Sequence, residues 1–233
     1  MNITKGSHLL NDKIIYDITP FTHLDYPNKL AAIVWFCGCN MRCIYCYNSD
    51  IVFSKEGEYT PKELIAFLKK RVGLLDGVVL SGGEPTLYDL LPLCRQIKEM
   101  GFSIKLDTNG THPDVVKELV TEELVDYIAL DFKAKNGKFG YITGSSRFDK
   151  FTETLDFLIQ RAFDFEVRTT VHPDLLQPED INQMMEELKS RGYRGPYYLQ
   201  KFIKTNNNIG DIGEPITCFD TTKLSNLLPI VWR

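Results

Sequence analysis

Four of the six cysteines crowd into ten residues, and their spacing indicates a metal centre. Cys39, Cys43 and Cys46 follow the pattern Cys-x3-Cys-x2-Cys directly after an apolar run, so one loop can wrap three thiolates around an iron–sulfur cube. Three ligands leave the fourth iron open, as a catalytic site requires. A structural zinc site with Cys37 as fourth ligand is the alternative, although Cys37-Gly38-Cys39 is tighter than common zinc spacings. We therefore predict a [4Fe–4S] cluster whose catalytic metal ligands are Cys39, Cys43 and Cys46.

A second motif, Ser81-Gly82-Gly83-Glu84-Pro85, follows the next apolar run. Glycines at such a place let the backbone come close to a ligand and expose its amide and carbonyl groups. Alone, the motif is more often a simple turn. Its position one strand–helix unit after the cysteine loop favours a ligand-binding site to which both loops contribute.

Polar side chains also end the later apolar runs, where the carboxyl ends of parallel strands meet at one rim. Residues two apart on a strand share a face, so Asp131 and Lys133 can point the same way. Taken alone, that pair would be a solvated ion pair of little energetic weight. Charged groups inside apolar strands are costly to bury without a partner, which favours a common site over scattered surface charges. The polar residues at these strand ends are Asp107, Thr108, Asp131, Lys133, Arg168 and Gln200.

The elements that must position these residues alternate as apolar runs and amphipathic helices, the pattern of βα units around a parallel sheet. Thr60-Pro61-Lys62-Glu63 is a capping box that starts one helix, and Thr111–Val120 is a shorter helix. Six strands are too few for a closed eight-unit barrel, so a six-unit open barrel and a doubly wound sheet both fit. The expected strands are Leu30–Phe36, Gly77–Leu80, Phe102–Leu106, Asp126–Asp131, Phe165–Val171 and Tyr197–Ile203.

Length and composition predict one α/β domain over residues 1–233, with a cluster loop at 37–48 and a flexible loop at 205–215. The net charge is −4 and the bases are scattered, which gives no argument for a nucleic-acid or membrane partner. The longest apolar stretch, Leu30–Cys37, is too short to span a bilayer. Met1–Leu10 has no apolar core of a signal peptide, so we expect a cytoplasmic protein whose cysteines are not a disulfide framework.

The cysteine spacing, with aromatic Tyr45 before the last cysteine, resembles the signature loop of the radical S-adenosylmethionine (SAM) superfamily. The resemblance implies an open partial (β/α)6 barrel and an oxidoreductase whose reduced cluster splits SAM into methionine and a 5′-deoxyadenosyl radical. It also implies that Tyr45 lies against the adenine and that the Gly-Gly-Glu motif binds the amino group of the methionine moiety. The cofactor-binding residues expected on this basis are Tyr45, Ser81, Gly82, Gly83, Glu84, Asp107, Thr108, Asp131, Lys133 and Arg168.

A resemblance to one group of enzymes within this superfamily covers most of the chain. Residues 16–34 are similar to the opening of anaerobic ribonucleoside-triphosphate reductase activating proteins, and Cys46-Tyr47-Asn48 is similar to the Cys-His-Asn of glycyl-radical activating enzymes. Asp131-Phe132-Lys133 and residues 141–144 also resemble that group. The resemblance implies an oxygen-sensitive activase that makes a glycyl radical on an anaerobic ribonucleotide reductase, with a flavodoxin- or ferredoxin-type electron donor. Residues 205–215 would then be a lid or a docking element for the partner.

The same resemblance implies a monovalent cation held by Asp107, Thr108 and Asp131 beside the SAM carboxylate, since carboxylates suit hard cations. Two other functions stay open. A 7-carboxy-7-deazaguanine synthase-like enzyme usually continues the last cluster cysteine with Asp-Thr, where this chain has Tyr47-Asn48. A non-catalytic iron–sulfur protein would need no SAM, and the Gly-Gly-Glu motif argues against it.

Overall fold

A computed structural model describes residues 11–233, and Met1–Leu10, for which we expect no signal peptide, lie outside the described residues. The described chain forms two compact units. The first unit contains residues 11–40, 50–108 and 112–128, and the second contains residues 41–49, 109–111 and 129–233. The chain crosses from one unit to the other inside the cluster loop, so Cys39 belongs to the first unit and Cys43 and Cys46 belong to the second.

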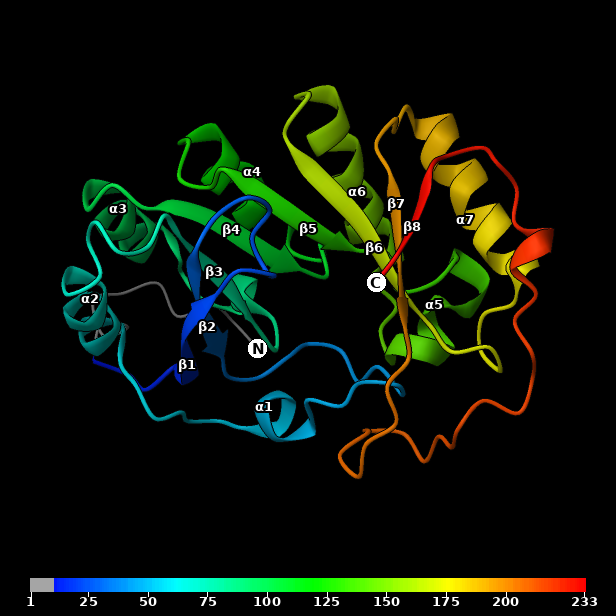
Figure 1. Cartoon of the computed structure of the whole chain (residues 1–233), viewed down its shortest axis with the longest axis horizontal. Coiled ribbons are helices and arrows are strands. Elements are labelled where there is room, and N and C mark those ends of the chain that lie inside the picture. Colours follow the sequence, from blue (N-terminus) through cyan, green and yellow to red (C-terminus); the bar gives the residue numbers. More distant parts are fainter. Residues whose placement is uncertain (1–10) are drawn as a thin grey trace. The chain divides into compact units, whose positions relative to one another are not determined.

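Strands β1 to β4 of the first unit pair in chain order (Figure 1). They are β1 (Ile15–Thr22), β2 (Ala31–Phe36), β3 (Gly77–Gly82) and β4 (Ser103–Thr108). The first pair is antiparallel and the other two are parallel. Strands β2 and β3 are buried along most of their length, as expected where helices cover a parallel sheet. The helices and turns of this part of the chain are α1 (Ser49–Phe53), α2 (Pro61–Lys69), η1 (Pro85–Leu87), α3 (Leu91–Glu99) and α4 (Pro113–Thr121).

The second unit continues the alternation of strands and helices along the chain. Strands β6 (Phe165–Val171), β7 (Tyr197–Lys201) and β8 (Ile230–Trp232) are parallel neighbours, as Figure 1 shows. Strand β5 (Tyr127–Asp131) crosses the boundary between the units. The helices and turns are α5 (Asn136–Thr143), α6 (Phe148–Gln160), α7 (Pro178–Arg191) and η2 (Thr221–Lys223).

The eight strands follow one another in chain order in an open sheet, which confirms the α/β class and the open arrangement. All six expected strands are present within a few residues of their predicted ends. Two strands were missed: β1, which carries Pro20, and β8, which is three residues long. No helix within residues 11–233 is long and apolar enough to cross a membrane.

Local signals explain where the helices begin. Thr60 and Glu63 form the expected capping box at the start of α2: the Thr60 hydroxyl accepts from the Glu63 amide and the Glu63 carboxylate accepts from the Thr60 amide. Helix α7 has an analogous reciprocal cap made by Gln177 and Asp180. Proline is at the first or second position of both helices, where its missing amide hydrogen costs nothing.

Candidate functional site

The polar groups of the first unit gather where β3 and β4 end. Glu84 follows β3 and is only 1% exposed. Its Oε1 accepts from the Thr86 amide at 3.1 Å, from the Thr86 hydroxyl at 2.6 Å and from the Thr108 hydroxyl at 2.7 Å. A buried carboxylate requires such donors. Glu84 and Thr108, two expected cofactor residues, therefore belong to one hydrogen-bonded group that also ties η1 to the end of β4.

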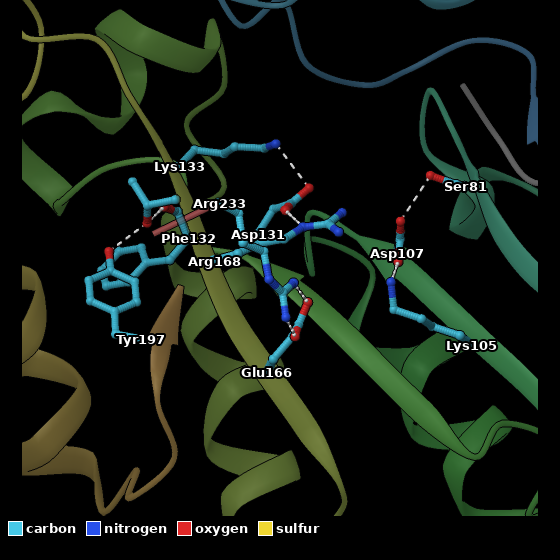
Figure 2. A network of polar contacts seen from close by, with 11 residues as sticks. Ser81, Lys105, Asp107, Asp131, Phe132, Lys133, Glu166, Arg168, Tyr197 and Arg233 are labelled. Atoms are coloured by element: carbon cyan, nitrogen blue, oxygen red, sulfur yellow. Dashed lines mark hydrogen bonds and ion pairs between the residues drawn. The ribbon is translucent and has the colours of Figure 1, made fainter. Parts of the chain in front are cut away.

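Asp107 lies between two donors, as Figure 2 shows. Its Oδ2 accepts from the Ser81 hydroxyl at 3.1 Å, and its Oδ1 accepts from Lys105 Nζ at 2.7 Å. The Lys105 side chain is 3% exposed and that of Asp107 12%. Lys105 was missed as a site residue, although the i, i+2 spacing that linked Asp131 to Lys133 applies equally to Lys105 and Asp107.

The glycines of the second motif are required by packing within the protein. Gly82 has φ +113°, and a Cβ there would lie 2.3 Å from the Phe36 amide nitrogen. A Cβ on Gly83 would lie 1.8 Å from the Gly38 carbonyl oxygen. Gly38 directly precedes Cys39, and its carbonyl also accepts from the Glu84 amide at 2.9 Å. The motif thus holds the chain that leads into the cluster loop.

The second unit carries a three-residue ionic group, also drawn in Figure 2. Asp131, at the end of β5, accepts from Arg168 Nε at 2.5 Å and from Lys133 Nζ at 3.0 Å. All three side chains are less than one-fifth exposed. Burial alone would raise the pKa of Asp131, but the charges of Arg168 and Lys133 outweigh it and lower that pKa to about 2. Burial alone would lower the pKa of Lys133, but the charge and hydrogen bond of Asp131, together with Tyr45 and Cys43, outweigh burial and raise that pKa well above its usual value.

Cys43 lies near this ionic group and near Cys46 in the second unit, whereas Cys39 belongs to the first unit. All three thiols are free of disulfides. Burial raises the pKa of Cys43 to about 11, with Lys133 acting in the opposite direction. Within residues 11–233, no group of three or more His, Cys, Asp or Glu side chains is arranged to hold a metal ion.

Tyr45, between these cysteines, is 5% exposed. Its hydroxyl is buried and forms no hydrogen bond with any described residue. Burial raises the pKa of Tyr45 well above its usual value, so the phenol stays neutral. A buried hydroxyl without a protein partner is a group whose hydrogen bond a bound ligand or water would supply.

The radical SAM superfamily model matches residues 33–188, which contain the cysteine motif and every expected cofactor residue. The chain therefore belongs to the radical SAM superfamily. Enzymes of this superfamily use a [4Fe–4S] cluster and SAM, so both predicted cofactors are confirmed at the level of the family.

Three relatives with assigned names are similar to this chain. A protein of Methanocaldococcus jannaschii that carries the name of a glycyl-radical enzyme activating enzyme is 34% identical over 186 residues, with 76% of this chain and 75% of that protein aligned. The pyruvate formate-lyase-activating enzyme of Clostridium pasteurianum is 29% identical over 190 residues, with 76% of each chain aligned. A 7-carboxy-7-deazaguanine synthase of Thermococcus kodakarensis is 28% identical over 127 residues, which is 45% of this chain and 49% of that enzyme.

Solved structures confirm the fold. Streptococcus suis SuiB bound to its precursor peptide SuiA has a TM-score of 0.65 at 14% identity, with 86% of this chain aligned. Native anSMEcpe with bound AdoMet has a TM-score of 0.59 at 18% identity, with 74% aligned. The chain spans about half of each structure, 48% and 53% respectively.

Proposed function

We propose that the chain is a glycyl-radical enzyme activase, and that its partner is an anaerobic ribonucleoside-triphosphate reductase. The 34% identity to a protein named as an activating enzyme, over three-quarters of both chains, carries the proposal. The pyruvate formate-lyase-activating enzyme supports it over the same share of the chain. The alignment to a deazaguanine synthase covers less than half of the chain and makes ring contraction the alternative.

The residues present fit the two cofactors. Cys39, Cys43 and Cys46 are not in disulfides, and their thiolates would hold the cluster. The unpartnered Tyr45 hydroxyl fits a polar ligand atom. When bound, the cluster and SAM supply the hydrogen-abstracting radical chemistry, and the protein supplies position and electrostatics.

The protein's own side chains hold the charged groups of the candidate site in fixed positions. Arg168 and Lys133 keep Asp131 ionised, and Asp131 in turn fixes both cations at the end of β5. In the first unit, the Ser81 hydroxyl and the Lys105 ammonium donate hydrogen bonds to Asp107 and hold its carboxylate in position. We propose that these groups bind the carboxylate and hydroxyl groups of SAM. The monovalent cation expected at Asp107, Thr108 and Asp131 remains a prediction.

Electron paramagnetic resonance tests the proposed reaction. Reconstituted protein, reduced by a flavodoxin- or ferredoxin-type donor and supplied with SAM, should give the doublet of a glycyl radical on the anaerobic reductase. A reductase whose radical-bearing glycine is replaced by alanine, and the chain with Cys43→Ala, are the controls and should stay silent. A radical formed on pyruvate formate-lyase instead would change the partner but keep the activase. No radical on either enzyme, together with turnover of a pterin-like substrate, would establish the ring-contracting alternative.

A further inference from the structure

The cluster loop has no regular secondary structure between Cys39 and Asn48, so its backbone hydrogen-bonding groups need partners from other segments. Two amide groups of the loop have their hydrogen-bond partners at the end of α5. The Arg42 amide donates to the Thr143 carbonyl at 2.7 Å, and the Ile44 amide donates to the Ile142 carbonyl at 3.0 Å. The last carbonyls of a helix lack partners within the helix, and here they anchor the loop.

The other side of the loop is held by a segment about 160 residues further along the chain. The Gly210 amide donates to the Ile44 carbonyl at 2.8 Å, and the Ile209 amide donates to the Cys46 carbonyl at 2.8 Å. Between them, the Asn208 side-chain amide donates to the Tyr45 carbonyl at 3.1 Å. Three consecutive carbonyls, on the residues that lead from Cys43 to Cys46, are thus fixed by three consecutive residues of one segment.

We call residues 203–217 the clamp segment. Asn208 shapes it from within, because its Oδ1 accepts from the Thr205 amide at 2.8 Å while its Nδ2 reaches Tyr45. The far end is tied to the loop that follows β6. There Asp174 accepts from the Ile216 amide at 3.0 Å and from the Thr217 amide at 2.7 Å. The clamp segment is therefore anchored independently of the cluster loop that it contacts.

Contact between the clamp segment and the cluster loop leaves no room for a side chain at Gly210. A Cβ there would lie 2.7 Å from both the Cβ and the carbonyl oxygen of Ile44. The φ angle of Gly210 is not in the left-handed region, so the requirement is steric rather than conformational. Gly213, in the same segment and also without positive φ, would place a Cβ in open space.

We infer that the clamp segment positions the cluster loop, with Asn208 and Gly210 as positioning residues that hold the backbone between Cys43 and Cys46. This inference rests on the proposed cluster ligands and adds a role for a segment that carries none of them. Because the clamp acts on ligand backbone, its loss should loosen the thiolates and change the cluster environment.

Two pairs of matched variants test the inference. Asn208→Asp keeps the acceptor for Thr205 but replaces the donor to Tyr45 with a carboxylate oxygen, and Asn207→Asp makes the same charge change at the neighbouring exposed residue. Gly210→Val pushes against Ile44, and Gly213→Val adds the same side chain where space is open. Each protein is reconstituted anaerobically, and three quantities are measured: iron release to a chelator, the spectrum of the reduced cluster, and thermal unfolding of the cluster-free chain.

Asn208→Asp and Gly210→Val should each lose iron roughly threefold to tenfold faster than the wild type and shift the spectrum of the reduced cluster, as the loss of one or two hydrogen bonds predicts. The two control variants should match the wild type. Release rates and spectra that match the wild type in both clamp variants would overturn the clamp. Equal effects in a clamp variant and its control would overturn it too. A wild-type chain that takes up no [4Fe–4S] cluster would instead overturn the cluster ligands of the proposed function.

Discussion

Removing the guanidinium of Arg168 should destabilise the protein in a pH-dependent way. Asp131 has a pKa of about 2 in the folded chain against an ordinary value of 3.8. Each unit of pKa difference is worth about 1.4 kcal/mol, so the ionised Asp131, with the attraction of the cations set against the cost of burial, contributes about 2 kcal/mol net to stability near neutral pH. Arg168 is the larger contributor, and Arg168→Gln should therefore cost about 1 to 2 kcal/mol.

The sign of the pH dependence follows from the depressed pKa of Asp131. A carboxylate with a lowered folded-state pKa stabilises the protein fully above its ordinary pKa, and this contribution is lost as the pH falls through the folded value. The difference between wild type and Arg168→Gln should be complete at pH 6, should shrink below pH 4 and should approach zero near pH 2.

Urea unfolding of the cluster-free chain between pH 6 and pH 3 measures this difference. The matched control is Arg161→Gln, which removes an exposed guanidinium at the end of α6 and should change stability little at any of these pH values. A destabilisation of Arg168→Gln that is equal at pH 6 and pH 3 would refute the ionic explanation, as would stability equal to that of the control.

Three further predictions concern other parts of the described chain. Lys105→Met removes the ammonium from Asp107 and should cost about 3 kcal/mol in urea unfolding, most of it recovered by adding Asp107→Asn; no recovery would contradict the pairing. Gly83→Ala should distort the carbonyl of Gly38 and lower iron uptake even without SAM, whereas a defect seen only in SAM binding would place the glycine at the ligand. Asp180→Asn removes the carboxylate that accepts from two lysines and from the α7 cap. It should lower the free energy of unfolding by about 1 to 3 kcal/mol at pH 7. This effect should fade in acid, because the pKa of Asp180 is lowered in the folded chain and its stabilising charge is lost as the pH falls through that value.

Local signals predicted the elements that position the site. The six expected strands are rich in apolar and β-branched or aromatic residues, and the capping box at Thr60 forms its hydrogen bonds within four residues of sequence. Strand β8 is three residues long, too short to show a periodicity. Helix α5 was missed because Gly137 and Gly140 interrupt it and its apolar residues do not form a stripe.

Only part of the candidate site was predicted, because some of its contacts have a signal in the local sequence and others do not. The ionic group of Asp131, Lys133 and Arg168 was foreseen from charges placed inside apolar strands. Lys105 carries the same signal on β4 and was overlooked. The clamp on the cluster loop has almost no side-chain signature, since two of its three contacts join backbone atoms of segments far apart in sequence. Backbone contacts between distant segments have no local sequence pattern, so they are seen only in the folded structure.

Cluster content of cysteine variants tests the central claim most directly. We expect about four irons per chain in anaerobically reconstituted wild-type protein, and a reduced-cluster signal in electron paramagnetic resonance that changes when SAM is added. Cys39→Ala, Cys43→Ala and Cys46→Ala should each lose this signal, whereas Cys37→Ala, at a buried position after β2, should keep it. A full SAM-responsive signal in any of the first three variants, or its loss in Cys37→Ala alone, would contradict the assignment.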